Sequence, residues 1–489
     1  MTAETATAGT TPEPNEPTES NDVVVNDVVV VGGGISGLAC AYRLQRLGRS
    51  VALLESSAQA GGLFGTAMQD GFLFETGPQS FQGTETILAL VRDLGIEGEL
   101  CRADSKAPRY VLRHGKLVEV PLTPQALLSS SLLGMKSRLK LASEAFTRSK
   151  PPTQEESIAD FVRRKFGHEI LEYLVTPFVS GVYAGDPEKL SLSAAFPTLE
   201  QWEREYGSVL RGAMKSRRSV SGSSGPPPLC SFRRGVHTLT KAMAENLGAH
   251  AHMGARVTTI EPAAGQADGR APSQADGAKY RVRVERPGAT EELLARAVVV
   301  ATPAYVAAHL VEPISAALAK TLSGVAYAPV VVVTMGYYAK QFSRLPQGFG
   351  VLIPRSEKQR TLGIVWNSSL FPGRAPEGQV NITSFLGGAT DTEIMEKTDA
   401  ELSAIVTAEA EKILGITGPP ISTGIWRHPK ALPQYNLGHH HVVRAIREGE
   451  QSAPGLFFAG NYLEGPAIGK CIGLAFQTAE RASHYVFGS

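Results

Sequence analysis

The chain has 489 residues, a formal net charge of +1 and 43% hydrophobic residues, an ordinary composition for a globular protein. At roughly 150 residues per domain, this length predicts two or three domains. The near-zero charge argues against nucleic acid as a partner, because a phosphate backbone is bound by a basic surface. The chain has no apolar run of about 18 residues, so no membrane-spanning helix is expected. The four cysteines form no CxxC, and we expect reduced thiols and no metal site.

The first 22 residues are rich in Pro, Thr and Glu and contain no Lys or Arg. A secretory signal needs a basic start and an apolar run, and a mitochondrial leader needs Arg, so neither fits. We expect a disordered tail over residues 1–22 and a cytoplasmic, bacterial protein.

A βαβ unit opens the ordered part of the chain. The run DVVVV at 27–31 predicts a buried strand, 36–47 a helix closed by Gly48, and 50–54 a second strand. Between the first strand and the helix stands GGGISG, residues 32–37.

The glycines of this loop fit the G-x-G-x-x-G pattern of a dinucleotide site. Gly32 permits the tight turn, Gly34 lets the backbone approach a pyrophosphate, and Gly37 lets the helix pack on the strand. The helix N-terminus then offers free N–H groups to the phosphates. Glu55 ends the second strand, where a carboxylate bonds a ribose hydroxyl. The pattern alone does not separate FAD from NAD.

The middle of the chain alternates between helical and extended patterns. Residues 121–211 read as largely helical, with an amphipathic segment within 125–146. Residues 217–229 read as a flexible breaker, and 262–278 as an expanded hairpin tip without function. Apolar runs predict further strands near Val257 and at 280–284, 298–301, 330–335, 380–385 and 456–459, the last followed by a helix to the C-terminus.

Further motifs are spread over the chain, from Gly61-Gly62 and GFLFETGPQSF (71–81) to the C-terminal LFFAGNYLEGPAIGKC (456–471). The others are APRYVLRHGKL (107–117), DFVRRKFG (160–167), TPFVSGVYAGDPEKLS (176–191), GFGVLIP (348–354), SFLGG (384–388) and LPQYNLGH (432–439). With these motifs the chain resembles the FAD-dependent amine oxidase and protoporphyrinogen oxidase superfamily, and within it the protoporphyrinogen oxidase family.

The resemblance implies a mixed α/β fold with a Rossmann-type FAD-binding domain built from discontinuous segments. That domain takes residues 23–105, 230–303 and 452–489. A mainly helical, membrane-associating domain takes 106–215, and a substrate domain with a mixed sheet takes 304–451. Peripheral contact with the cytoplasmic face of the inner membrane is left open, since an apolar helix face usually packs on its own protein. A homodimer is left open too.

The resemblance also assigns residues to non-covalent FAD. Leu63 and the stretch from Gly77 lie along the flavin, the backbone at Val257 holds the adenine, and Trp426 with the segment from Pro466 lines the isoalloxazine. The predicted cofactor residues are Gly32, Gly33, Gly34, Ile35, Ser36, Gly37, Glu55, Ser56, Gly62, Leu63, Gly77, Pro78, Gln79, Ser80, Val257, Trp426, Gly460, Asn461, Pro466, Ala467 and Ile468.

For the substrate, the resemblance assigns Arg109 to a propionate and Phe385 to a pyrrole ring. Leu352 and Leu362 become apolar walls, and Gly181 a backbone carbonyl near the pyrrole N–H groups. This fits a porphyrinogen, a large apolar molecule with carboxylates on one edge that needs an apolar cleft and a cation. Some family members carry Arg where this chain has Gln79, which puts a second propionate contact in doubt.

The implied reaction is oxidation of protoporphyrinogen IX to protoporphyrin IX in haem synthesis. Three cycles remove six electrons, by transfer of hydride from a meso carbon to flavin N5 and loss of a proton from a pyrrole nitrogen. Dioxygen is consumed and hydrogen peroxide formed, and no side chain is certain as an acid or base. A coproporphyrinogen III oxidase, a flavin amine oxidase and a non-enzymatic flavin carrier are the alternatives. Amine oxidases usually carry a Lys on the strand that here spans 325–338, which has none.

Overall fold

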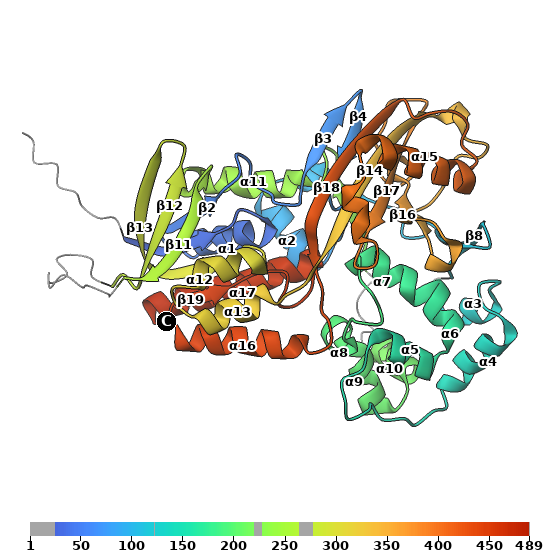
Figure 1. The fold of residues 1–489 in the computed structure, drawn as a ribbon, viewed down its shortest axis with the longest axis horizontal. Coiled ribbons are helices and arrows are strands. Elements are labelled where there is room, and N and C mark those ends of the chain that lie inside the picture. The colour runs from blue at the N-terminus through green and yellow to red at the C-terminus, as the bar shows by residue number, and fades with distance from the viewer. Residues whose placement is uncertain (1–24, 122, 220–226, 264–276, 489) are drawn as a thin grey trace, which may run out of the picture.

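The computed structural model describes residues 25–121, 123–219, 227–263 and 277–488. The described residues form two seven-stranded sheets with their covering helices, two small sheets and a unit of short helices (Figure 1). The predicted disordered tail and hairpin tip fall mostly outside the described residues. The predicted breaker at 217–229 is wrong at its two ends, because helix α10 continues to Ser219 and strand β9 begins at Leu229, while residues 220–226 lie outside the described residues.

The first sheet has the strand order β10-β2-β1-β13-β12-β11, with β19 also paired to β13. Strands β10, β2, β1, β13 and β19 run parallel where they pair, while β11 and β12 form antiparallel pairs. The bounds are β1 Val25–Val31, β2 Val51–Glu55, β10 Ala251–Met253, β11 Arg256–Pro262, β12 Tyr280–Arg286, β13 Ala289–Val300 and β19 Leu456–Phe458.

Helices cover both faces of this sheet, which explains its continuous apolar strands. Val28 and Val30 pack on one face against α1 (Ile35–Arg46), α2 (Glu85–Asp93), α11 (His237–Leu247) and α17 (Ile468–Phe487). Val29 and Val31 pack on the other against α12 (Ala304–Val311), α13 (Ala316–Ser323) and α16 (His439–Ser452). A strand buried on both faces needs no polar alternation, so DVVVV is stable here.

The second sheet has the order β18-β14-β17-β16-β15-β7-β8 and is mixed, since β7 and β15 are parallel and the other pairs antiparallel. Helix α15 (Asp399–Leu414) covers one face. The bounds are β7 Arg109–Arg113, β8 Lys116–Glu119, β14 Tyr327–Tyr338, β15 Gly350–Leu352, β16 Thr361–Val365, β17 Gln379–Gly387 and β18 Ser422–Pro433. β14 is twice as long as predicted, because its ladders with β17 and β18 extend past the valine run.

Two small sheets link these layers. The hairpin β3 (Thr66–Gln69) and β4 (Phe72–Glu75) turns at Asp70 and Gly71, both with positive φ. The other joins β5 (Phe81–Gln82), β9 (Leu229–Phe232) and β6 (Leu100–Arg102).

The helical unit spans Pro124 to Ser219 and includes α3 Pro124–Ser129, α4 Met135–Glu144, α5 Ile158–Lys165, α6 His168–Ile170, α7 Thr176–Tyr183, α8 Leu192–Ala195, α9 Pro197–Tyr206 and α10 Val209–Ser219. The amphipathic segment within 125–146 forms two helices. The break falls between Ser130, whose backbone is extended, and Gly134, the N-cap of α4. No helix of the described chain is long and apolar enough to cross a membrane.

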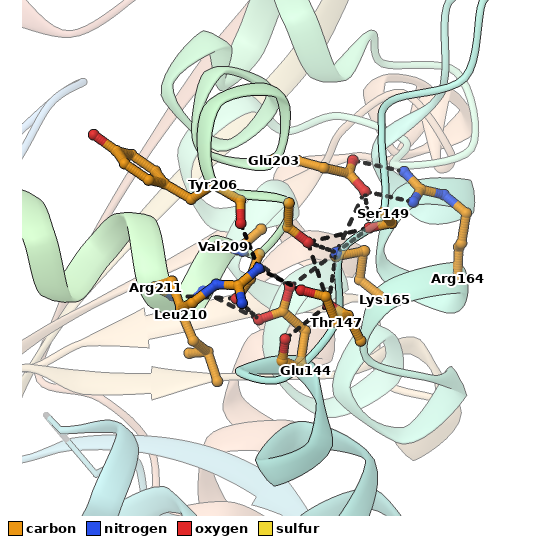
Figure 2. Close-up of polar contacts among 12 residues, drawn as sticks. Glu144, Thr147, Ser149, Arg164, Lys165, Glu203, Tyr206, Val209, Leu210 and Arg211 are labelled. Atoms are coloured by element: carbon orange, nitrogen blue, oxygen red, sulfur yellow. Dashed lines mark hydrogen bonds and ion pairs between the residues drawn. The ribbon is translucent and has the colours of Figure 1, made fainter.

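A buried charge network holds the helical unit together (Figure 2). Lys165 Nζ lies 2.9 Å from a Glu144 oxygen and 3.3 Å from a Glu203 oxygen, and both carboxylates are fully buried. Glu144 also accepts from the N–H groups of Val209 and Leu210, at the start of α10. The network therefore joins α4, α5, α9 and α10 through paired charges. Each of these charged groups would be costly to bury without its partner.

Burial by itself would raise the pKa of Glu203, but hydrogen bonds from Arg164 and Ser149, with the Lys165 charge, lower it to about 2. The ionised carboxylate therefore stabilises the folded chain above the ordinary pKa of 4.5. That stabilisation is lost as the pH falls through 2.

We expect Glu203→Gln to lower the free energy of unfolding by about 3–5 kcal/mol at pH 7, because Lys165 then lacks one buried partner. The difference from wild type, measured by urea unfolding, should shrink between pH 4.5 and pH 2. Glu200→Gln on the same helix is the control, since its partner Arg204 is 68% exposed and the pair is worth below about 1 kcal/mol. Equal losses in the two variants would contradict this account.

Candidate functional site

A cleft of about 430 Å³ opens at the carboxyl edge of the parallel strands, where open α/β sheets bind ligands. It is lined on one side by the glycine loop and the end of β2, and on the other by the loop after β13 and the end of β18. Its volume is in the usual range for a cofactor site.

The glycine loop has the geometry that the sequence predicted. Gly32 has φ +105°, and a Cβ on Gly37 would lie 1.8 Å from the carbonyl oxygen of Gly32, so only glycine fits there. A Cβ on Gly34 would meet nothing within 4 Å, which leaves its backbone open to the cleft. Gly34 is the N-cap of α1 and no side chain caps the helix, so its first N–H groups are free for an anion.

Glu55 is held in position by the glycine loop itself. One carboxylate oxygen accepts from the Gly33 N–H at 2.6 Å, and the other accepts from the Ser57 N–H at 2.7 Å. The carboxylate lines the cleft beside the loop, so it can also accept a hydroxyl from a ligand. The backbone of β11 approaches here too, because the Ala255 N–H donates to the Glu55 carbonyl.

The opposite wall of the cleft was not predicted. Thr302 and Tyr305 line it, together with Tyr327 and Lys430. The buried hydroxyl of Thr302 has no hydrogen-bond partner among the described residues, which fits a ligand that supplies one. The Thr302 methyl would be 3.1 Å from a Cβ on Gly32, so the two walls meet closely. The sequence signal for this wall is the pair Thr302-Pro303, which follows directly after the predicted strand at 298–301.

These features fit a dinucleotide: an uncapped helix N-terminus, a carboxylate for a ribose and an orphaned hydroxyl. Fourteen predicted cofactor residues line the cleft, namely Gly32, Gly34, Ile35, Ser36, Glu55, Ser56, Gly62, Leu63, Pro78, Val257, Gly460, Asn461, Pro466 and Ile468. The other seven do not line it: Trp426 packs with the lining residues Ala431 and Leu432, and the rest are close to lining residues in sequence, namely Gly33, Gly37, Gly77, Gln79, Ser80 and Ala467. Gly77 packs on Leu63, since a Cβ there would lie 2.2 Å from the Leu63 carbonyl oxygen.

Gln79 turns its side chain away from the cleft and into the second sheet. Its amide oxygen accepts from Asn367 and, at 3.2 Å, from Thr383, while its amide nitrogen donates to the Gly77 carbonyl at 2.8 Å. Because the side chain is buried and its groups are bonded, it is not placed to meet a carboxylate of a substrate.

A fully buried ion pair lies next to this contact. Glu75, at the end of β4, is 3.3 Å from Arg374, which precedes β17. The Glu75 carboxylate accepts from Thr66 and the Val236 N–H, and Arg374 donates to Ser231. Burial raises the pKa of Glu75 to about 7, and the charge of Arg374 opposes that rise. The pair joins the β3–β4 hairpin to the segment before β17, and Ser231 ties the small sheet at β9 to the same point.

Three of the residues assigned to the ring systems project from one face of the second sheet. Leu352 is paired with Gly363, Gly363 with Phe385, Phe385 with Val332, and Val332 with Trp426. Lateral neighbours in a sheet point to the same side. Phe385 and Trp426 also pack in a cluster with Ala431 and Leu432, which line the cofactor cleft. The apolar face is therefore continuous with the cleft.

Helix α7 covers the far part of this face. A Cβ on Gly181 would be 2.8 Å from the Leu352 side chain. Leu362 is the extra residue of a β-bulge between Thr361 and Gly363, and its side chain reaches Gly388 beside the end of α7. The bulge therefore turns Leu362 toward the helix that carries Gly181.

Arg109 stands at the open end of the same face. It is paired with Gly350, two positions before the Val111–Leu352 pair, so it shares the face of Leu352. Its guanidinium is exposed and lies 5.5 Å from the Phe349 ring centroid. No carboxylate pairs with it among the described residues, which leaves its charge available.

The described residues contain no group of three or more His, Cys, Asp or Glu placed to hold a metal. All four cysteines are buried and free. His439, the first of three adjacent histidines, is buried and bonded to the Tyr462 carbonyl at 2.8 Å.

The comparisons agree with this geometry. The family described as flavin containing amine oxidoreductase matches residues 35–486. The chloroplastic protoporphyrinogen oxidase of Oryza sativa subsp. japonica is 36% identical, over 94% of this chain and 88% of the relative. The coproporphyrinogen III oxidase of Bacillus subtilis (strain 168) is 28% identical, over 94% of this chain and 98% of the relative. A solved structure from Exiguobacterium sp. 255-15 has a TM-score of 0.77 at 24% identity, over 94% of this chain and 99% of that structure's chain.

The resemblance and the mixed α/β fold predicted from the sequence are thus confirmed. A flavin bound at a dinucleotide fold is FAD, so the cofactor prediction is confirmed as well. The chain belongs to the flavin-containing amine oxidoreductase family.

Proposed function

We propose that the chain oxidises protoporphyrinogen IX to protoporphyrin IX, with FAD as cofactor and dioxygen as electron acceptor, in tetrapyrrole biosynthesis. The observation that carries this proposal is the apolar face from Trp426 through Phe385 to Leu352, which ends at the unpaired cation of Arg109. An apolar macrocycle with carboxylates on one edge matches both parts of that face. The rice relative at 36% identity is named for the same reaction.

The length of the face separates this substrate from a small amine. β7, which carries Arg109, and β18, which carries Trp426, are five strand spacings apart, or about 24 Å along the sheet. A small amine held beside Trp426 would leave Arg109 without a role, whereas a tetrapyrrole extends toward it. Strand β14 also has no Lys, the residue that amine oxidases usually carry there.

When bound, FAD supplies hydride acceptance and reoxidation by dioxygen. The residues of the chain position the substrate for that chemistry. Phe385 and Leu352 pack against the pyrrole rings of the non-planar substrate and exclude water. Gly181 lies in the last turn of α7, whose carbonyls have no helical donor, so its oxygen can accept from a pyrrole N–H. Arg109 fixes the carboxylate edge away from the cleft.

A coproporphyrinogen III oxidase is the second candidate, because the Bacillus relative bears that name at 28% identity. Coproporphyrinogen has four carboxylates where protoporphyrinogen has two. Among the described residues of the face, Arg109 is the free cation, while the nearby Arg113 is paired with Glu169 and Arg360 with Asp391. A single free cation favours the substrate with fewer carboxylates.

The proposal includes the division of the chain into FAD-binding, helical and substrate domains, and the roles assigned above to the individual site residues. Peripheral membrane contact would use the helical unit, where Met135, Leu139 and Phe146 are 64–85% exposed near Lys136 and Lys140. A cytoplasmic, bacterial setting and a homodimer are kept as further proposals.

Anaerobic mixing with protoporphyrinogen IX tests the reaction directly. We expect the flavin absorbance near its visible maximum to bleach within one turnover and to return when dioxygen is admitted, with hydrogen peroxide formed. Bleaching by a primary amine but not by the porphyrinogen would make the chain an amine oxidase. A flavin that no substrate reduces would make it a carrier.

Glu55→Gln should weaken FAD binding by roughly ten- to a hundredfold, because a hydrogen bond to a charged acceptor is worth about 1.5–3 kcal/mol. The fold should persist, since the amide oxygen can still accept from the Gly33 N–H. Fluorescence titration of the apoprotein with FAD measures the change. Glu261→Gln, on β11 of the same sheet, serves as the control. Unchanged affinity would mean that Glu55 only supports the loop.

Arg109→Ala should raise KM for protoporphyrinogen about tenfold, near 1.4 kcal/mol, with a smaller effect on kcat. FAD content and melting temperature should stay close to wild type, because Arg109 is exposed and unpaired. The effect should disappear for a porphyrinogen whose propionates are esterified. Equal losses on acid and ester would show that Arg109 shapes the pocket and does not bind a carboxylate.

A further inference from the structure

The cofactor cleft receives a cation from the second sheet. Lys430 lies near the end of β18, lines the cleft and is exposed. Its Nζ is 4.3 Å from the centroid of the Tyr305 ring, at the start of α12. No carboxylate within ion-pair distance compensates its charge in the described part of the chain. The aromatic ring restrains the ammonium group by about 0.5–1 kcal/mol and does not neutralise its charge.

The charges that line the cleft show what this lysine faces. They are Glu55, Arg256 and Lys430. FAD brings two phosphate charges to a cleft that already contains the Glu55 carboxylate. The N-terminus of α1 offsets about half a charge, so the remaining compensation falls to the two basic residues.

The two basic residues stand at different ends of the bound dinucleotide. Arg256 begins β11 beside Ala255, whose N–H donates to the Glu55 carbonyl, and it therefore belongs to the adenosine end. Tyr305, over which Lys430 lies, is three residues after Thr302, which touches the glycine loop at Gly32. The pyrophosphate belongs at that loop, at the N-terminus of α1.

We propose that Lys430 is a cofactor-binding residue that pairs with the FAD pyrophosphate across the cleft from the glycine loop, with Tyr305 holding its side chain. This inference rests on the proposed FAD site. The phosphates are then held by backbone N–H groups of one sheet and a cation of the other. Because β18 also carries Trp426, cofactor binding and the placement of the substrate face are joined by one strand.

The test is titration of the full-length apoprotein with FAD, and competition of bound FAD by ADP and by adenosine. Lys430→Gln should weaken FAD and ADP binding about fivefold and flatten the salt dependence of both. Adenosine, which has no phosphate, should compete equally well in both proteins. Lys430→Arg should restore most of the affinity. Lys340→Gln is the matched control, since Lys340 lies 5.4 Å from the Tyr338 ring centroid at the other end of β14 and outside the cleft.

The proposal is overturned if Lys430→Gln matches the Lys340→Gln control in FAD affinity and salt dependence. It is also overturned if adenosine loses as much affinity as ADP, because the substitution would then have disturbed the pocket as a whole. A wild-type protein that binds no FAD would instead reject the proposed function.

Discussion

The site depends on a polar contact between the second sheet and the β3–β4 hairpin, whose flanking residues Phe64 and Pro78 line the cofactor cleft. The end of β4 and the loop after it carry Glu75 and Gln79, and Arg374, Asn367 and Thr383 meet them from β17 and the segment before it. All of these side chains are buried. A buried charge or amide without its partner is strongly destabilising, so this contact favours one placement of the hairpin, and of the cleft-lining residues that flank it, on the second sheet. Apolar packing alone tolerates sliding and would not fix that placement as narrowly.

This placement brings the cofactor cleft and the apolar face of the second sheet together into one site. The first sheet offers a cofactor cleft at its carboxyl edge, and the second offers an apolar face with a cation at its far end. Chemistry between a flavin and a macrocycle needs the two within a few ångströms, in a fixed orientation. Phe385 and Trp426 share a cluster with Ala431 and Leu432 at the rim of the cleft, so the face begins where the cleft ends. The helical unit then covers the face through α7.

The parts of the site that could be predicted from the residues are local in sequence. The loop at 32–37 and the carboxylate of Glu55 belong to one βαβ unit, whose strand pairing and helix packing follow from about 30 neighbouring residues. Leu352, Phe385 and Arg109 were reached only through the resemblance, because a leucine or phenylalanine in a strand is more often core. These three side chains share one face because of the pairing register between β7, β15, β16 and β17. The direction of Leu362 depends on a β-bulge that the sequence pattern does not indicate.

The sequence by itself determined the dinucleotide loop, the family and the positions of several apolar strands, because these follow from short-range patterns. Those strands are β1, β2, β11, β12, β13, β14, β17 and β19. Only the tertiary structure decided which distant residues face the cofactor. Thr302, Tyr305 and Lys430 meet in one wall although more than 120 residues separate the first from the last. Gln79 lies beside predicted flavin contacts yet turns inward, since Asn367 and Thr383 offer it partners that solvent does not. The physical reason is the same in each case: a side chain's direction is set by the neighbours across a sheet, and these are chosen by the fold.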